Sequence, residues 1–493
     1  MGEIDMDNKF FEIEKKEKLF KREIDGFYYW NVFRRQIIFD ITLTKNKTTL
    51  KKWKDKFSLK SRLINFRYLK RYIIKKEKNI DILLVADPRR ILNKEGKYEN
   101  IFIDNVNIFL SKYYKILILE EPSYMAWMFA QAPHIVPTMS NNIVYTDFID
   151  MKCPFYRFFY RIFKRKIYKK FLKEIDYIIN IVKREYGIDL TFRKKIYLYT
   201  LEIYYLMRKE YEKVIKKINP KIVLFNYKPT EVKALINLIC KDKKIPTVNL
   251  QHGIISKDLS VEMQTDRDNL DVFPDYLFAF GEILANCPSK IYNENNIKYI
   301  GHPYLENKLK IQIERPSFMK EGYKYILIVS QEIIGKEFSE FTSALAKELK
   351  EYKEYKIIFK YHPAEYNREY KNLKKDNIIE IKTLEYDIYT LQKYSYIQVG
   401  AYSTGLYEGI MFELPTVVIN NFYGADSTIE TLKFMKKGFY SIKDAKELSN
   451  FIKLGKIEKP NKEDIQKIWK KDSYNNLLKE VRKIQQFSLK ITK

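Results

Sequence analysis

Three of the four histidines in this chain stand at the ends of short apolar segments. They are His252 in VNLQHGII, His302 in YIGHP and His362 in FKYHP. In open parallel sheets, ligands bind at the carboxyl ends of the strands, where the loops converge. An imidazole titrates near neutral pH and can take a proton from an attacking hydroxyl group. A single histidine there could be structural, but with three we expect at least one to belong to a functional site.

Small or charged residues adjoin two of these histidines. Gly253 lets the backbone turn sharply, or approach a ligand closely, beside His252. Pro363 favours an extended backbone at His362, so the strand sets the direction of that side chain. Lys360, two residues earlier on the same strand face, would add positive charge there or remain a solvated side chain.

The segment YIQVGAYSTGLYEGIMFELPTVVI predicts a strand that runs into a helix. Ser403, Thr404 and Gly405 open that helix, and Glu408 lies one turn into it. The N–H groups and the dipole at a helix N-terminus suit phosphate. Ser403 or Thr404 could also serve as an N-cap, with Glu408 as a dipole partner, and capping is compatible with phosphate binding. Ser330, at the end of YILIVS, is a further candidate for nucleotide binding.

The sequence gives little support for a metal or another cofactor. Two D-x-D triplets, at 5–7 and 266–268, could hold a divalent cation, but neither follows an apolar strand. Three cysteines without a C-x-x-C pair predict neither a disulfide framework nor a zinc site. No G-x-G-x-x-G motif, P-loop or nucleophile elbow is present. We therefore expect no metal and no cofactor.

The composition predicts an anionic partner. The 493 residues carry a net charge of +28, which favours nucleic acid, an acidic membrane surface or phosphorylated substrates. The acidic start lacks the pattern of a signal peptide, and no segment approaches the length of a membrane helix. With the sparse cysteines, these features predict a cytoplasmic protein that would contact a membrane only from its surface.

Two segments combine aromatic and basic residues at helical spacing. Residues 1–78 predict a basic, aromatic helical extension, and residues 158–182 predict an amphipathic helix. The apolar stripe of that helix is Phe159, Ile162, Phe163, Ile167, Phe171, Ile175 and Ile178. Such helices either pack their apolar face on a protein core and expose their basic face to water, or they bind lipid headgroups or an anionic acceptor.

Short apolar strands alternate with helices in two successive series. Residues 221–225, 230–244 and 246–250 predict a strand, a helix and a strand, and such a crossover makes the two strands parallel. A polar link at 306–324 separates the series. This pattern predicts two doubly wound α/β domains with a cleft between them. The expected parts are the extension 1–78, a first domain 79–310, a second domain 311–445 and a helical tail 446–493.

The order of these motifs resembles the GT-B glycosyltransferases, in which two facing Rossmann-like domains hold the donor nucleotide mainly in the second. Over residues 220–420 it resembles enzymes that build bacterial surface polymers from cytidine-activated donors. These are CDP-glycerol glycerophosphotransferases, and sialyl-, polysialyl- and Kdo transferases with an HP motif. In the glycerophosphotransferases a His-Gly pair after a strand supplies the catalytic base. The resemblance therefore implies this role for His252 and Gly253.

The resemblance also implies the donor contacts. The HP histidine of these families contacts the donor phosphates, and His362 with Pro363 matches it. A Ser/Thr pair in a strand-to-helix turn binds phosphate, which corresponds to Ser403 and Thr404. A glutamate seven residues before the proline of the following strand binds the ribose in many GT-B enzymes, and Glu408 stands at that distance.

The chain departs from these families at two points. Gln251 stands where the glycerophosphotransferase motif usually has Trp, although it remains a possible site residue. The acidic base motif of the sialyltransferases is not evident, so the donor stays open. His302 could be a second site histidine or part of a hinge turn, and the sequence favours neither.

We expect a metal-independent transferase at the inner face of the cell membrane. It would move a sugar or a polyol phosphate from a nucleotide-activated donor, CMP- or CDP-linked, onto a cell-surface polysaccharide or a lipid-linked acceptor. One alternative is a sugar-nucleotide 2-epimerase of the same fold. The other is a basic nucleic-acid-binding protein, but no nucleic-acid-binding module is recognisable and we do not expect that partner.

Overall fold

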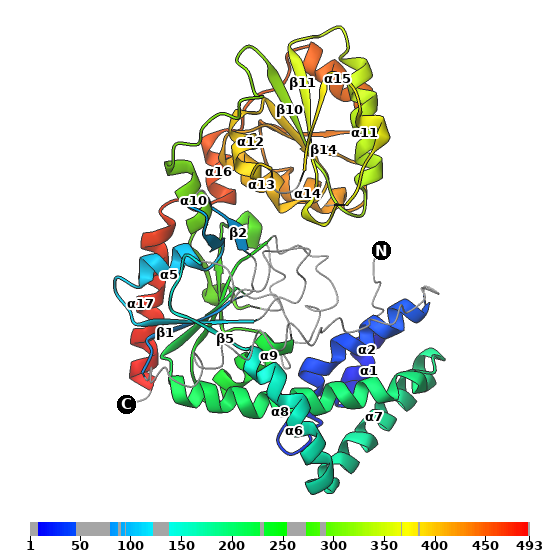
Figure 1. Ribbon diagram of the computed structural model, residues 1–493, viewed down its shortest axis with the longest axis vertical. Coiled ribbons are helices and arrows are strands. Elements are labelled where there is room, and N and C mark those ends of the chain that lie inside the picture. Colours follow the sequence, from blue (N-terminus) through cyan, green and yellow to red (C-terminus); the bar gives the residue numbers. More distant parts are fainter. Residues whose placement is uncertain are drawn as a thin grey trace.

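Two parallel sheets form the centre of the computed structural model, and each has the strand order of a Rossmann fold (Figure 1). The central strands of both sheets are buried on both faces, as parallel strands covered by helices require. The described residues are 8–45, 79–86, 90–93, 95–121, 138–226, 231–253, 273–285, 292–365, 367–382 and 385–491.

The first domain is built on a seven-stranded sheet of order β5-β4-β1-β6-β7-β8-β9. Its strands are β1 Ile82–Ala86, β4 Ile116–Glu120, β5 Ile143–Tyr145, β6 Ile222–Phe225, β7 Thr247–Leu250, β8 Tyr276–Ala279 and β9 Ile297–Tyr299. Helix α9, Glu231–Asp242, connects β6 to β7, and these two strands are parallel, as the sequence predicted. A small hairpin of β2 (Arg90–Leu92) and β3 (Tyr98–Asn100) precedes helix α5, Asp104–Leu110.

The second domain is built on a six-stranded sheet of order β12-β11-β10-β13-β14-β15. Its strands are β10 Lys324–Val329, β11 Tyr355–Lys360, β12 Ile378–Ile381, β13 Ile397–Gly400, β14 Thr416–Ile419 and β15 Phe439–Ile442. Its helices are α11 Gly335–Glu348, α12 Ile388–Tyr394, α13 Thr404–Met411, α14 Ala425–Leu432, α15 Ala445–Lys453 and α16 Lys462–Ile468. In both sheets, β1 and β10 lie at the switch point where the strand order reverses.

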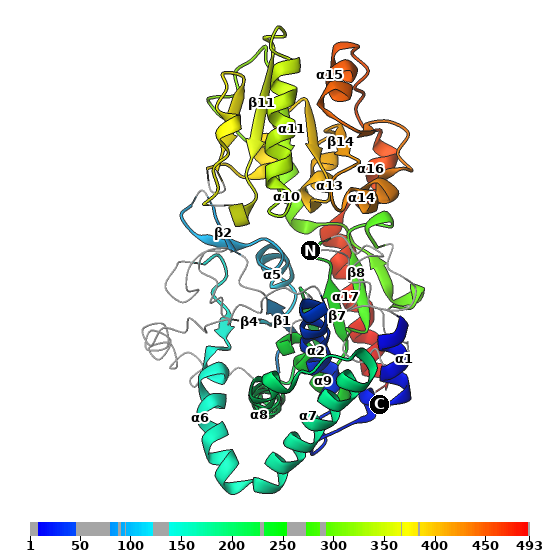
Figure 2. The same cartoon turned by 90° about the vertical axis from the view of Figure 1, so that its right-hand side faces the viewer.

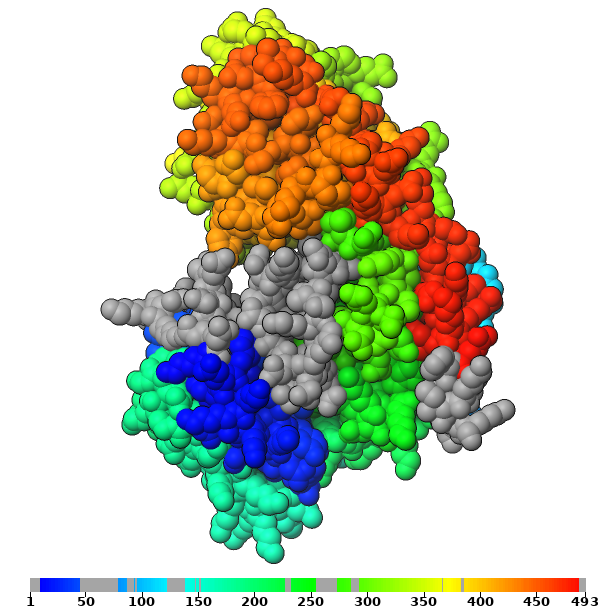
Figure 3. All heavy atoms as spheres, turned by 180° about the vertical axis from the view of Figure 1, so that it is seen from behind, coloured from blue at the N-terminus to red at the C-terminus, as the bar shows by residue number. Residues whose placement is uncertain are grey.

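The chain passes between the two domains twice. Helix α10, Pro303–Lys310, leads towards the second domain, and α17, Ser473–Ile491, returns from it to the first (Figure 3). The two passages are joined where the Ser473 N–H donates to Glu306 Oε2 at 2.7 Å. Residues 446–493, expected as a helical tail, thus contribute helices to both domains. The side chains of α17 that pack on the first sheet are Leu477, Leu478, Val481 and Ile484.

A bundle of long helices extends from the first domain, away from the second (Figures 1 and 2). It contains α1 Asn8–Lys16, α2 Trp30–Lys45, α6 Asp147–Phe163, α7 Arg165–Tyr186 and α8 Lys194–Ile218. We call these helices the arm. The described part of the predicted extension 1–78 is helical and shares a core with α7 and α8, whereas residues 46–78 lie outside the described residues.

The arm corrects the prediction of one continuous amphipathic helix over 158–182. The helix breaks at Lys164, whose φ and ψ of −120° and 46° are not helical. Phe171, Ile175 and Ile178 are buried as expected, but Phe163 is exposed together with other residues of α6. Among the described helices, none is long and apolar enough to span a membrane.

Candidate functional site

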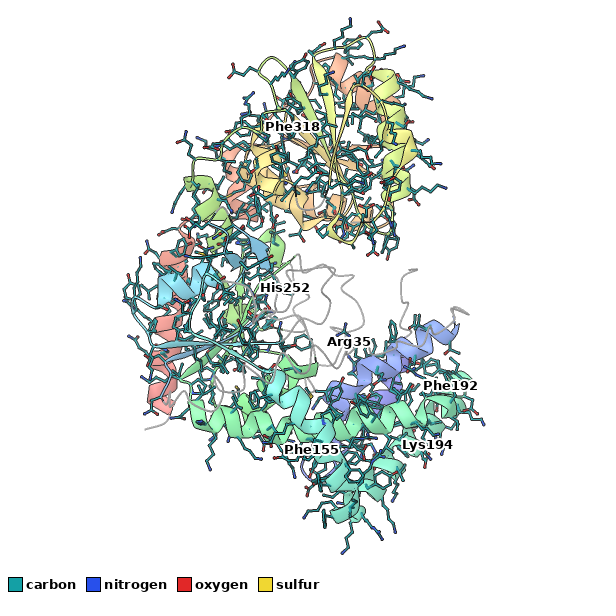
Figure 4. All side chains as sticks on the ribbon, in the orientation of Figure 1. Arg35, Phe155, Phe192, Lys194, His252 and Phe318 are labelled. Atoms are coloured by element: carbon teal, nitrogen blue, oxygen red, sulfur yellow. The ribbon has the colours of Figure 1, made fainter. Side chains whose placement is uncertain are left out.

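The His252-Gly253 turn follows the carboxyl end of β7, on the side of the first domain that faces the second (Figure 4). The buried Gln251 side chain holds this turn. Its Oε1 accepts from the Phe280 N–H at 2.7 Å, and its Nε2 donates to the carbonyls of Gly253 at 2.9 Å and Leu284 at 2.7 Å. Each such bond contributes about 1 kcal/mol. Gln251 therefore orients the backbone on both sides of His252.

The Ser-Thr-Gly turn of the second domain lies opposite this glycine. Ser403 caps α13, because its Oγ accepts from the Gly405 N–H at 3.2 Å. A Cβ atom built on Gly253 would lie 3.8 Å from Thr404 Oγ1. The two turns that the sequence singled out in separate domains are therefore neighbours, and a side chain longer than a methyl group at 253 would project into the space between them.

His362 follows the carboxyl end of β11. Its Nδ1 accepts from the Ala364 N–H at 3.2 Å, and its own N–H donates to Glu365 Oε2 at 2.8 Å. Burial lowers the pKa of His362, so the ring is neutral near pH 7. A neutral ring whose Nδ1 accepts carries its proton on Nε2. That nitrogen is thus a donor of the kind that binds a phosphate oxygen.

Lys360 and Ser330 lie beside each other at the ends of β11 and β10. The Ser330 N–H donates to the Lys360 carbonyl at 3.1 Å. Lys360 is buried, not the solvated side chain that the sequence also allowed; its Nζ donates to the Lys382 carbonyl at 2.8 Å, and burial lowers its pKa to about 8. The buried Ser330 Oγ has no hydrogen-bond partner among the described residues. This edge of the second sheet therefore offers a hydroxyl group beside a cation.

Glu408 lies on α13, where that helix approaches the first domain. Burial raises the pKa of this carboxyl group to about 7, and a hydrogen bond from Tyr389 opposes the rise. The Tyr389 ring contacts Tyr304 of α10, with 5.8 Å between the ring centroids. The buried Tyr304 hydroxyl has no hydrogen-bond partner among the described residues. Glu408 therefore belongs to the junction of the two domains.

His302 is the N-cap of α10 and is 6% exposed. Its Nδ1 accepts from the Leu305 N–H at 3.4 Å, and its ring stacks on Phe280 with 4.4 Å between centroids. Burial lowers its pKa to about 3. Of the two roles that the sequence left open, this geometry favours the hinge turn. The Phe102 ring neighbours both His302 and His252, with 6.4 and 6.2 Å between the ring centroids.

Solved structures resemble the chain over most of its length, although no protein-family model and no curated protein matches it. One is an assigned UDP-N-acetylglucosamine 2-epimerase from Listeria monocytogenes. It is 14% identical, with a TM-score of 0.50 over 83% of this chain and 96% of that one. The chain has a GT-B fold. The fold class expected from the sequence is therefore confirmed.

Two other GT-B structures resemble the chain more weakly. The 2-epimerase from Neisseria meningitidis, bound to UDP-N-acetylglucosamine, is 15% identical over 83% of this chain and all of its own, with a TM-score of 0.49. A spinosyn rhamnosyltransferase complexed with thymidine diphosphate is 10% identical over 84% of this chain and all of its own, with a TM-score of 0.41. At such identities the likeness concerns the fold.

Sequence reasoning missed one buried pair at the switch point of the first GT-B domain. Lys233 of α9 is buried, and its Nζ donates to the carbonyl and Oδ1 of Asn226 at 2.7 and 2.9 Å. Asn226 directly follows β6, beside β1. The signal in the sequence was a lysine among the apolar residues of the helix segment VKALI. This pair fixes the direction of an amide at the edge that faces the second domain.

The expectation that the protein binds no metal stays a prediction. Within the described ranges, no three His, Cys, Asp or Glu side chains are grouped to hold a metal ion. Both D-x-D triplets lie outside the described residues.

Proposed function

We propose that this GT-B protein is a transferase that uses a nucleotide-activated sugar or polyol phosphate, CMP- or CDP-linked. Its acceptor would be a growing cell-surface polysaccharide or a lipid-linked glycan at the inner face of the membrane. The observation that carries the proposal is the approach of Gly253 to Thr404 Oγ1. This approach places the turn that carries a candidate base next to a candidate phosphate-binding turn.

The proposed reaction divides the work between the domains. His252 takes the proton of the acceptor hydroxyl, and that oxygen attacks the activated carbon or phosphorus of the donor. The departing nucleotide phosphate is stabilised by His362 Nε2–H, by Ser403 and Thr404, and by the N–H groups that open α13. The buried Lys360 adds positive charge at the same edge of the second sheet.

Nucleotide binding is the direct test of this division. In a thermal-shift screen of CMP, CDP, UDP and GDP, we expect a cytidine nucleotide to raise the melting temperature most. The His362→Ala variant should bind that nucleotide about tenfold more weakly, because it loses a hydrogen bond to a charged group. Lys374→Ala, at an exposed lysine of the same domain, should bind as the wild type does. Equal affinity of the His362→Ala variant for every nucleotide would contradict the assignment.

A second candidate, a sugar-nucleotide 2-epimerase, is favoured by Glu408. A carboxyl group with a pKa of about 7 can both take and give a proton at neutral pH, and epimerisation needs no acceptor. If the chain is a transferase, incubation with UDP-N-acetylglucosamine alone should leave the sugar unchanged, as followed by NMR. Epimer formation that Glu408→Gln abolishes and Glu413→Gln retains would replace the transferase by the epimerase.

A further inference from the structure

The outward face of α6 in the arm is apolar. Helix α6 buries Ile149 and Cys153 against the rest of the first domain. On the same side of the helix, the Tyr160 hydroxyl shares a hydrogen bond of 2.9 Å with the Tyr205 hydroxyl of α8. Its exposed apolar residues are Phe155 (63%), Phe158 (64%), Phe159 (43%), Ile162 (48%) and Phe163 (74%). A helix at a protein surface normally presents its polar face to water. Here the helix presents rings on the side that faces away from the core.

The spacing of these residues places them together. Positions 155, 158, 159, 162 and 163 follow the i, i+3, i+4, i+7 and i+8 pattern, so they share one helix face. Two of the rings, Phe155 and Phe159, are in contact, with 5.1 Å between their centroids. Contiguous exposed apolar surface of this kind marks a contact with a protein or a membrane.

The charge around this face selects the kind of partner. Residues 151–173 contain nine Lys or Arg and no Asp or Glu. Arg157 and Arg161 form ion pairs with Glu202 of α8, and Lys152 with Glu210. Within the described part of the chain, no ion pair is formed by Lys164, Arg165, Lys166, Lys169, Lys170 or Lys173.

A second copy of the chain would bring this positive charge against itself. An anionic bilayer instead offers negative headgroups for the lysines and an apolar interior for the rings. Figure 2 shows α6 and α7 as a V whose apex lies at the end of the molecule remote from the second domain. A bilayer at the apex would therefore leave the facing edges of the two sheets accessible.

We propose that the α6–α7 apex docks the protein on an anionic phospholipid bilayer. The rings of α6 enter the interface between headgroups and acyl chains, while the cations that open α7 contact lipid phosphates. The proposal identifies the surface by which the protein would reach the membrane location proposed above. It does not depend on the reaction, because it rests on the exposed rings and the charge of the arm.

Vesicle sedimentation tests the role of the rings. The full chain should bind phosphatidylcholine vesicles that contain about one third phosphatidylglycerol, and bind pure phosphatidylcholine vesicles far less. Combining Phe155→Ser, Phe158→Ser and Phe163→Ser should weaken binding at least tenfold. Phe192→Ser is the matched control, since Phe192 is also a 63% exposed phenylalanine but lies in the connection between α7 and α8, outside the α6–α7 apex (Figure 4). The control should bind as the wild type does.

A charge variant tests the role of the lysines. Changing Lys164, Lys166 and Lys169 to Gln should weaken binding about 100-fold, since each cation near an anionic surface contributes about a factor of five. The same change at the exposed Lys350, Lys353 and Lys374 of the second domain gives a control variant with the same net charge as the apex variant. This control should bind vesicles almost as the wild type does.

Three results would overturn the proposal. The first is equal binding to neutral and anionic vesicles, and the second is unchanged binding of both apex variants. The third is the capture of the apex by RNA or by a second copy of the chain in place of vesicles. The nucleotide thermal shift should be the same in wild type and apex variants, so failure of the docking proposal and failure of the proposed reaction are separable.

Discussion

Replacing His252 by Ala is expected to lower the transfer rate by roughly a thousandfold, because the acceptor hydroxyl loses its general base. Nucleotide affinity should stay near the wild-type value, since the donor contacts proposed above lie in the second domain. The measurement pairs initial rates, with the donor class identified by the thermal-shift screen, with calorimetric binding of the free nucleotide. Added imidazole should restore part of the lost rate, because it can occupy the space left by the side chain.

Two comparisons separate a catalytic His252 from one that only positions the donor. His362→Ala should lose nucleotide affinity, whereas His252→Ala should lose rate. Gln251→Leu should also lose rate and keep nucleotide affinity, because the bonds from Gln251 to Phe280, Gly253 and Leu284 hold the His252 turn in place. If His252→Ala weakens nucleotide binding as strongly as His362→Ala does, and imidazole restores nothing, His252 positions the donor.

The sequence predicted the fold well because its strongest signals are local. Segments such as ILLVA and ILIV are apolar on both strand faces, which only a sheet covered on both sides can accommodate. The crossover from β6 through α9 to β7 then requires parallel strands. The second sheet nevertheless has a strand that was not predicted, β15, whose segment FYSI includes exposed and half-buried residues and lacks that apolar signature.

The positions of the candidate site residues at strand ends could be predicted for the same reason, but their surroundings could not. Lys360 reads in the sequence as an edge residue, yet it is buried, and the Lys382 carbonyl, 22 residues away, accepts a hydrogen bond from its Nζ. The exposure of the apolar face of α6 could not be predicted either. The apolar spacing in the sequence continues across Lys164, whereas the helix ends there. Such features depend on contacts between distant segments, which periodicity does not record.

His302 is the clearest case of such long-range determination. Its ring stacks on Phe280 and lies 5.7 Å from Trp469, which is 167 residues further along the chain. Trp469 in turn donates from Nε1 to the Tyr407 carbonyl of α13 at 2.8 Å. The sequence placed His302 at the exit of the first domain but could not supply these partners. They make the histidine a buried, neutral part of the passage between the domains.

Protonation of His302 should therefore destabilise the protein in mild acid. The pKa is about 3 in the folded chain and 6.5 as the ordinary value, so the unfolded chain binds the proton first as the pH falls. The stabilising contribution is complete above pH 6.5 and is lost progressively as the pH falls towards 3. Between pH 7 and pH 4 this amounts to roughly 3 kcal/mol of unfolding free energy.

The His302→Phe variant isolates this contribution. Phenylalanine keeps a ring against Phe280 but cannot titrate, and loss of the N-cap should cost about 1 kcal/mol at pH 7. Urea unfolding of both proteins from pH 4 to pH 8 should show the wild type losing its advantage below pH 6.5, so that the variant becomes the more stable one near pH 4. Carboxylates that titrate in the same range act equally on both proteins and cancel in the difference.

Histidine NMR provides an independent measurement. The chain has only four histidines, so the signal that is missing from the His302→Phe spectrum identifies His302. The His302 signal should not titrate between pH 5 and 8, since a ring enclosed by Phe280 and Trp469 is protonated only at a large desolvation cost. Parallel stability curves together with ordinary titration of this signal would mean that the ring reaches water. In that case the passage between the domains opens in solution, and His302 returns to the group of candidate site histidines.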